Sequence, residues 1–169
     1  VAVAGTVLTG DQLGLVMVET QPMKMAAAEA LFNSACGYNA SFSIFTLGTP
    51  DGSSELFSVR VPYLLSFLST HTFDGCVEGI RDLNAEYGVR FADTGLTDFS
   101  PILWVTYWAF RWMIGLGLAH AFVALVGLWI TRKNAKPVQK WMWNIAIFSA
   151  PMSMLASLVC WVFTEMGRQ

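Results

Sequence analysis

The stretch that decides the fold is Ile102–Ile130, ILWVTYWAFRWMIGLGLAHAFVALVGLWI. Its 29 residues include only Arg111 and His120 as charged or basic interruptions. Because about 20 consecutive apolar residues cross a bilayer, the stretch predicts a transmembrane helix. A charge at membrane depth costs roughly 2.5–3.5 kcal/mol, so Arg111 indicates a functional partner. Met113 adds a thioether that can bind a metal, and the pair points to a buried anionic cofactor, for which a propionate-bearing haem is a candidate.

The composition supports a membrane protein. Hydrophobic residues make up 54% of the chain and charged residues 13%, about half the usual share in soluble proteins. A second segment, Trp141–Phe163, is also long and apolar enough to span a bilayer. Val1–Thr9 is a short apolar run without the charged start of a signal peptide, so we interpret it as the end of a helix that begins upstream. We therefore expect a fragment of a larger, all-α integral membrane protein.

Charge asymmetry predicts the orientation of these segments. Residues 10–98 carry 11 acidic and four basic side chains, whereas residues 131–140 carry four basic side chains and no acid. By the positive-inside rule, residues 131–140 are cytoplasmic and the long segment is extracytoplasmic. No basic patch suggests nucleic-acid binding. The predicted parts are 1–9, the end of a transmembrane helix; 10–100, an extracytoplasmic loop; 101–130, a transmembrane helix; 131–140, a basic cytoplasmic loop; 141–164, a transmembrane helix; and 165–169, the start of an outer loop.

Within the outer segment, Met23–Phe32 is rich in strong helix formers and predicts a short helix after Pro22. Residues 74–87 predict another, and 46–54 are turn-rich. His120, inside the first span, is expected to make an interhelical hydrogen bond.

The cysteines fit the same orientation. Cys36 and Cys76 both fall in the outer segment, where oxidation is possible, and Cys160 lies inside a span. We predict a Cys36–Cys76 disulfide. The alternative is two unrelated thiols.

Four motifs occur in order along the chain: Gly10–Gly14 (GDQLG), Gln21–Ala30 (QPMKMAAAEA), Phe110–Met113 (FRWM) and Trp161–Gln169 (WVFTEMGRQ). Together they resemble the C-terminal portion of subunit I of the cytochrome bd-type quinol oxidases. The resemblance implies a transmembrane helix bundle fragment that holds the end of the sixth span, the quinol-binding loop in its short form, and the seventh and eighth spans.

The resemblance places residues needed for quinol oxidation at Lys24 and Glu29. Quinol oxidation releases two protons, so a carboxylate acceptor near the hydroxyl is chemically reasonable. Lysine would orient the ring oxygen or keep the carboxylate ionised. From the spacing alone, a solvated helix face is the alternative.

The resemblance also places haem-binding residues on the two spans. Met113 matches the ligand of the low-spin haem b iron, and Arg111 would compensate propionate charge. Glu165 matches the ligand of the high-spin haem b iron. Trp161 would pack among the haems, and Arg168 would pair with a propionate or with Glu165. The alternatives are a core methionine and an ordinary interfacial cap made of an aromatic ring, a carboxylate and an arginine.

The resemblance implies an electrogenic quinol:oxygen oxidoreductase of the prokaryotic cytoplasmic membrane, with ubiquinol or menaquinol as donor. Its cofactors would be low-spin haem b, high-spin haem b and haem d, or a third haem b in place of haem d. It would generate a proton motive force without pumping. Its expected partners are the second subunit of the oxidase heterodimer, small single-span subunits and membrane lipid. A related haem oxidase with another electron donor and a non-enzymatic transporter subunit are the alternatives.

Overall fold

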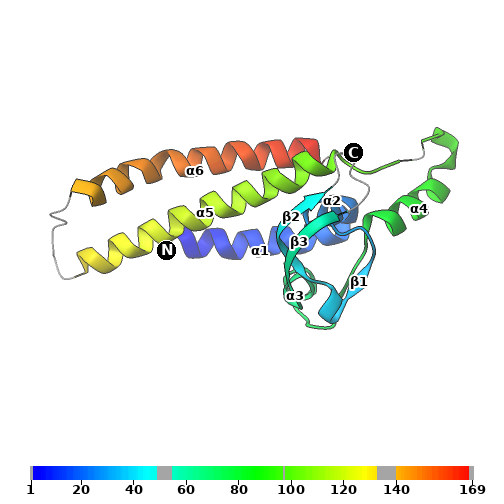
Figure 1. Ribbon diagram of the computed structural model, residues 1–169, viewed down its shortest axis with the longest axis horizontal. Helices are drawn as coiled ribbons and strands as arrows, with labels where there is room; N and C mark the ends of the chain where they lie inside the picture. Colours follow the sequence, from blue (N-terminus) through cyan, green and yellow to red (C-terminus); the bar gives the residue numbers. More distant parts are fainter. Residues whose placement is uncertain (1, 49–54, 97, 133–139, 168–169) are drawn as a thin grey trace. The chain divides into compact units, whose positions relative to one another are not determined.

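The computed structural model describes residues 2–48, 55–96, 98–132 and 140–167. It divides into two compact units, residues 1–108 with 165–169 and residues 109–164. Figure 1 labels the helices and strands described below. The described part is mostly helical, as predicted. Part of the turn expected at 46–54, most of the basic loop at 131–140, and Arg168 lie outside the described residues.

Four helices belong to the first unit: α1 (Ala2–Thr20), α2 (Pro22–Ala28), α3 (Leu64–Thr70) and α4 (Ile80–Arg90). Two 3-10 turns accompany them, at Gly37–Asn39 and Ala92–Thr94. The first helix does not stop at Thr9 but continues through the GDQLG motif. It ends where Pro22 disfavours helical geometry in the residue before it, and Gln21 accordingly has φ −137° and ψ 60°. The position of the membrane boundary within this helix stays a prediction.

The outer segment also contains strands, so the expectation of an all-α chain is corrected. β1 (Ala35–Cys36) pairs with β4 (Cys76–Val77), and β2 (Phe42–Gly48) pairs with β3 (Glu55–Val61), both antiparallel. The longer pair is rich in aromatic and β-branched residues, which favour strands. The helix expected at 74–87 begins only at Ile80, because the chain pairs as β4 first.

The short helix α2 is the centre of the first unit. Its residues from Met23 to Ala28 are all buried. On one side Met23 and Ala26 pack with Ile80 and Leu83 of α4. On another side Met25 packs in a second cluster with Leu31, Leu65 and Val77. A helix this short is marginal alone, so its stability comes from these contacts.

The second unit consists of most of α5 (Leu103–Thr131) and α6 (Lys140–Met166). Both helices are long and apolar enough to cross a membrane, at 29 and 27 residues, and they match the two predicted spans. The rings of Phe110 and Phe163 pack at 5.1 Å between centroids. His120 Nδ1 lies 2.9 Å from the Ser149 carbonyl oxygen, so the interhelical histidine is confirmed.

Candidate functional site

Lys24 is buried on α2, with only 7% of its surface exposed. Its aliphatic carbons lie against Gly167, just past the end of α6. A Cβ placed on Gly167 would sit 2.8 Å from both Cγ and Cε of Lys24. Lysines are seldom this buried, and Glu165 precedes the glycine by two residues. The structure therefore brings Lys24 next to the segment that carries Glu165.

Glu29 is fully buried and follows the last residue of α2. Its Oε2 accepts a hydrogen bond from the Ser43 backbone N–H at 3.0 Å. The next residue, Ala30, has φ 48°, which turns the chain sharply, and its carbonyl accepts a bond from Arg60 Nη2 at 3.0 Å. Arg60 is itself paired with Glu55 at 2.7 Å. Glu29 is therefore held by β2, whereas Lys24 lies against the end of α6.

Three buried hydroxyl groups extend from Glu29. Ser43 Oγ lies 2.6 Å from Thr46 Oγ1 and 2.8 Å from Tyr107 Oη. All three side chains are almost fully buried. Since buried hydroxyls are stable only when hydrogen-bonded, the cluster fixes the start of α5 against β2.

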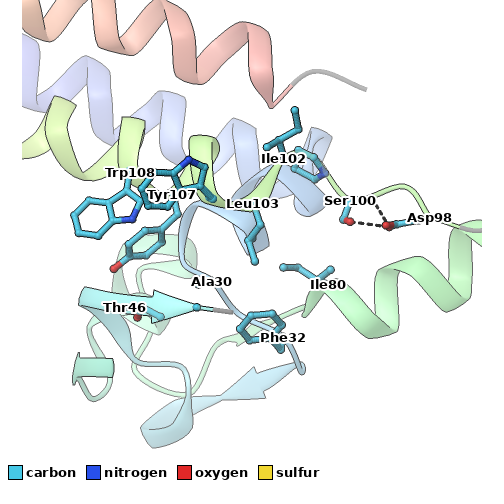
Figure 2. A pocket seen from close by; sticks show the side chains of 13 residues that line it. Ala30, Phe32, Thr46, Ile80, Asp98, Ser100, Ile102, Leu103, Tyr107 and Trp108 are labelled. Carbon is cyan, nitrogen blue, oxygen red and sulfur yellow. Dashed lines mark hydrogen bonds between the residues drawn. The ribbon is translucent and has the colours of Figure 1, made fainter. Parts of the chain in front are cut away.

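A pocket of about 680 Å³ adjoins this cluster (Figure 2). The turn after Glu29, β2, α4, and the segment that leads into α5 all contribute to its wall. The lining residues are mostly apolar or aromatic: Ala30, Phe32, Thr46, Gly48, Ile80, Asp98, Ser100, Pro101, Ile102, Leu103, Trp104, Tyr107 and Trp108.

The one charged side chain in that wall, Asp98, is already engaged. It accepts hydrogen bonds from the Ser100 hydroxyl at 2.6 Å, the Ser100 N–H at 2.9 Å and Asn84 Nδ2 at 3.0 Å. The bonds from Ser100 are the main reason that the pKa of Asp98 lies below its ordinary value. The carboxylate therefore stays ionised at neutral pH. Its hydrogen bonds join the segment that precedes α5 to α4.

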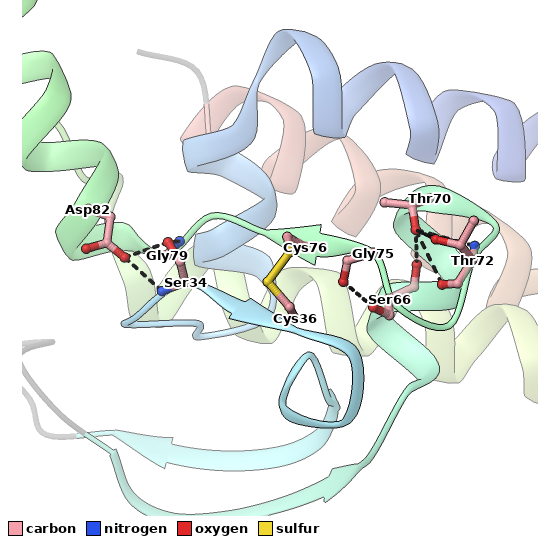
Figure 3. The surroundings of a disulfide bond; sticks show 9 residues. All are labelled: Ser34, Cys36, Ser66, Thr70, Thr72, Gly75, Cys76, Gly79 and Asp82. Atoms are coloured by element: carbon pink, nitrogen blue, oxygen red, sulfur yellow. Dashed lines mark hydrogen bonds between the residues drawn. A yellow bond between two sulfur atoms is a disulfide. The ribbon is translucent and has the colours of Figure 1, made fainter.

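The predicted disulfide between Cys36 and Cys76 is present and joins β1 to β4 (Figure 3). Next to it, Asp82 on α4 accepts bonds from the Ser34 hydroxyl at 2.5 Å and the Ser34 N–H at 2.9 Å. These bonds lower the pKa of Asp82. Gly79 is required here because a Cβ would lie 2.2 Å from the Asn33 carbonyl carbon. The disulfide region thus holds α4 against the chain that follows α2.

Arg111 and Met113 lie on α5 within the second unit, and both are half-buried. Arg111 Cζ is 5.2 Å from the centre of the Phe110 ring, a cation–π distance that stabilises a guanidinium in apolar surroundings. Met113 follows two residues later and offers its thioether.

On α6, Trp161 is exposed and precedes Glu165 by four residues, so the two share one face of the helix. Arg168 lies outside the described residues. No cluster of three His, Cys, Asp or Glu side chains that would bind a bare metal ion occurs in the described residues. A haem supplies four nitrogen ligands itself and needs one or two axial ligands from the protein. The Met113 thioether and the Glu165 carboxylate could each supply one such ligand, and the Arg111 guanidinium could pair with a propionate. These groups therefore fit a haem better than a free metal ion.

Sequence reasoning missed three features of the site: Ser43, Tyr107 and Gly167. Ser43 lies in an ordinary strand sequence, and nothing in its neighbourhood singles it out. Tyr107 gave a weak signal, as a hydroxyl group inside an apolar span. Gly167 was part of a quoted motif, but its contact with Lys24 joins residues that are far apart in the chain.

Comparisons with known proteins identify the family of the chain. The family profile described as "Cytochrome bd terminal oxidase subunit I" matches residues 1–169. Cytochrome bd ubiquinol oxidase subunit 1 of Bacillus subtilis is 37% identical over 98% of this chain and 34% of its own length. Cytochrome bd-II ubiquinol oxidase subunit 1 of Escherichia coli is 24% identical over 99% of this chain and 43% of its own length.

A second Bacillus subtilis protein, named putative cytochrome bd menaquinol oxidase subunit I, is 26% identical over 97% of this chain and 34% of its own length. The chain thus spans between about a third and somewhat under half of the length of these relatives. The match extends over every described element, including α2, α5 and α6. On this evidence the chain belongs to the cytochrome bd terminal oxidase subunit I family.

Proposed function

We propose that this chain is part of the haem-carrying subunit of a respiratory terminal oxidase that oxidises quinol at the outer face of the membrane and reduces oxygen to water. Each quinol gives up two protons and two electrons and becomes a quinone. Two quinols therefore supply the four electrons that one oxygen molecule takes up, with four protons, to form two waters.

The observation that carries this proposal is the contact between Lys24 and Gly167. It joins the helix of the proposed quinol-oxidising residues to the end of α6, where the proposed ligand Glu165 lies. Electron transfer from a donor to an acceptor requires the two to be close. The burial of Lys24 at this point supports such closeness between the proposed quinol residues and Glu165.

Glu29 is the proposed acceptor for a quinol proton. Its burial places the carboxyl group away from bulk water, and its Oε2 accepts a hydrogen bond from the Ser43 N–H. A carboxylate held in this way is suited to accept a proton from a bound hydroxyl. Lys24 is the proposed group that orients a ring oxygen. Because the two residues make different contacts, we assign them to different parts of the quinol.

Met113 would hold the iron of the low-spin b haem, and Glu165 would hold that of the high-spin b haem. When bound, the haems, with haem d or a third haem b, would supply the redox chemistry between quinol and oxygen. Arg111 would balance propionate charge from a position that Phe110 helps to stabilise. Trp161 would pack among the haems, and Arg168 would pair with a propionate or with Glu165.

Charge and the disulfide support the proposed orientation. Disulfides persist in oxidising compartments, so the Cys36–Cys76 bond supports an extracytoplasmic position for residues 10–100. Quinol protons are then released outside, while protons for water come from the cytoplasm. This separation generates a proton motive force without pumping. The second oxidase subunit, small single-span subunits and lipid are the proposed partners.

Family membership favours an oxidase over a transporter subunit. The burial of Lys24 and Glu29 disfavours the solvated helix face and supports quinol, rather than another donor, as the substrate.

The test uses the assembled oxidase that contains this chain. Its reduced-minus-oxidised spectrum is expected to show b-type haem signals, and oxygen uptake is expected to depend on quinol. Glu29→Gln preserves the size and an acceptor for the Ser43 N–H but removes the proton-accepting charge. We expect it to lower kcat with quinol about 100-fold, the lower end of general-base contributions, without changing the haem spectrum. Glu86→Gln, on the exposed surface of α4, is the matched control.

A complex without b-type haem signals would refute the oxidase assignment. Full quinol oxidation by Glu29→Gln would refute the role of this carboxylate.

A further inference from the structure

The pocket beside Glu29 has the lining expected for a flat, uncharged, aromatic ligand. Its volume of about 680 Å³ lies in the range of small-molecule sites, and aromatic rings from Phe32, Trp104, Tyr107 and Trp108 contribute to its wall. No cationic side chain lines it among the described residues. The single carboxylate, Asp98, is engaged by Ser100 and Asn84. A charged ligand would find no counter-ion here.

Two residues of the pocket wall, Thr46 and Tyr107, carry hydroxyl groups (Figure 2). Both hydroxyls are linked to Glu29 through Ser43. Both hydroxyls meet Ser43 Oγ, at 2.6 and 2.8 Å, and the N–H of the same serine donates to Glu29 Oε2 at 3.0 Å. One buried residue therefore connects the polar part of the pocket wall with the proposed proton acceptor. Buried networks of this kind fix side-chain positions, because each lost bond leaves an unsatisfied group.

We propose that this pocket binds the quinol head group and that the Tyr107 and Thr46 hydroxyls form its hydrogen-bonding wall. The inference rests on the proposed quinol oxidation and adds the residues that recognise the ring. Tyr107 bonds a ring oxygen, Ser43 holds Tyr107 in place, and the same serine aligns Glu29 with the ligand. Ile102 and Trp104, both exposed at the start of α5, extend the apolar surface for the isoprenoid tail.

The first experiment measures steady-state kinetics of the assembled oxidase with a short-chain quinol. Tyr107→Phe keeps the ring and removes the hydroxyl. We expect the KM for quinol to rise about three- to tenfold, the loss expected for one neutral hydrogen bond, while kcat and the haem difference spectrum stay unchanged. Ser43→Ala, which removes the anchor of Tyr107, is expected to raise KM by a smaller factor. Tyr38→Phe, an exposed tyrosine outside the pocket, is the matched control.

The second experiment locates the ligand directly. An azido-substituted quinone is photolysed in the wild-type complex, and the tryptic peptides are analysed by mass spectrometry. Cleavage after Arg90 and Arg111 releases residues 91–111, which contain the pocket wall from Asp98 to Trp108. We expect an adduct in this peptide that excess unlabelled quinol suppresses. The method reads out binding without activity.

An unchanged KM in Tyr107→Phe, or labelling that spares residues 91–111, would overturn the inference. If Glu29→Gln abolishes quinol oxidation while Tyr107→Phe leaves KM unchanged, the pocket assignment fails and the proposed function stands. If labelling maps to the pocket but Glu29→Gln retains full activity, the pocket stands and the role of Glu29 fails. If the wild-type complex oxidises no quinol and takes up no label, both fail.

Discussion

The outer segment and the two long helices position their proposed site residues in different ways. In the outer segment, Glu29 is fully buried and bonded to the Ser43 N–H of β2, and Lys24 is buried on α2 against Gly167, just past the end of α6. In α5 and α6, by contrast, large apolar side chains such as Trp112, Phe122 and Trp129 are exposed, and the most apolar window of each helix has no buried residue. The proposed quinol residues are thus enclosed by the fold, whereas the proposed haem ligands lie on helices whose apolar surfaces are exposed.

The sharpest test of this comparison is Met113→Leu. If Met113 serves an external cofactor, removing the thioether leaves the helix intact but eliminates the low-spin b-type signal and, with it, nearly all quinol oxidation. The measurement is the reduced-minus-oxidised spectrum of the assembled complex. Met154→Leu makes the same chemical change on the exposed surface of α6 and is expected to have no effect. An unchanged low-spin signal in Met113→Leu would show that the methionine is only a packing residue.

Removal of the disulfide tests whether the outer segment is stabilised by its own contacts. The bond joins residues 40 positions apart. In the chain-entropy model a closed loop of this size stabilises by about 4 kcal/mol. We expect Cys36→Ser/Cys76→Ser to lower the temperature at which quinol oxidation is lost, while the haem signals persist to the wild-type temperature. Cys160→Ser, inside α6, is the control. Simultaneous loss of both signals would contradict the independence of the two regions.

The sequence predicted the long helices well, because their signal is local. Length and apolarity alone locate both spans to within a few residues of α5 and α6. The helix after Pro22 could be predicted equally well, since proline and strong helix formers mark it. The strands β1 and β4 were missed because they contain two residues each and depend on partners distant in the chain. The longer strands β2 and β3 carried a local signal in their aromatic and β-branched residues that the prediction did not use.

The site was predictable only in part. Residue types suggested Arg111 and Met113, whereas the resemblance added Lys24, Glu29 and Glu165 and gave all five the roles that stay predictions. The neighbours of these residues could not be predicted from the sequence, because the contacts between Glu29 and Ser43 and between Ser43 and Tyr107 arise from tertiary folding. A sequence pattern can propose which groups react, but not which neighbours hold them.

Gly167→Ala tests the contact that joins the outer segment to the end of α6. The added methyl would lie 2.8 Å from Lys24 carbons, so the flexible lysine chain must move, at little cost in stability. We expect the KM for quinol to rise about twofold, less than a full hydrogen-bond loss would produce, with normal haem signals. Gly88→Ala adds a methyl where nothing lies within 4 Å and serves as the control. Identical kinetics in both variants would remove Lys24 from the quinol site.

The smallest expected effect concerns Asp82, at the edge of the outer segment near the disulfide. Its pKa is lowered from 3.8 in the folded state, chiefly by the hydrogen bond from the Ser34 hydroxyl. A lowered folded pKa means that the stabilising contribution is complete above the ordinary value and is lost as pH falls through the folded value. We therefore expect the Ser34 amide, which donates to Asp82, to lose protection from hydrogen exchange below about pH 4.

The Ala40 amide, which bonds to the Gly37 carbonyl, is the internal control. In Asp82→Asn the acid-dependent step should disappear, and a step that persists in this variant would assign the transition to another carboxylate. Because the group is at the surface, quinol oxidation at neutral pH should be unaffected, which separates the stability of this edge from the chemistry at Glu29.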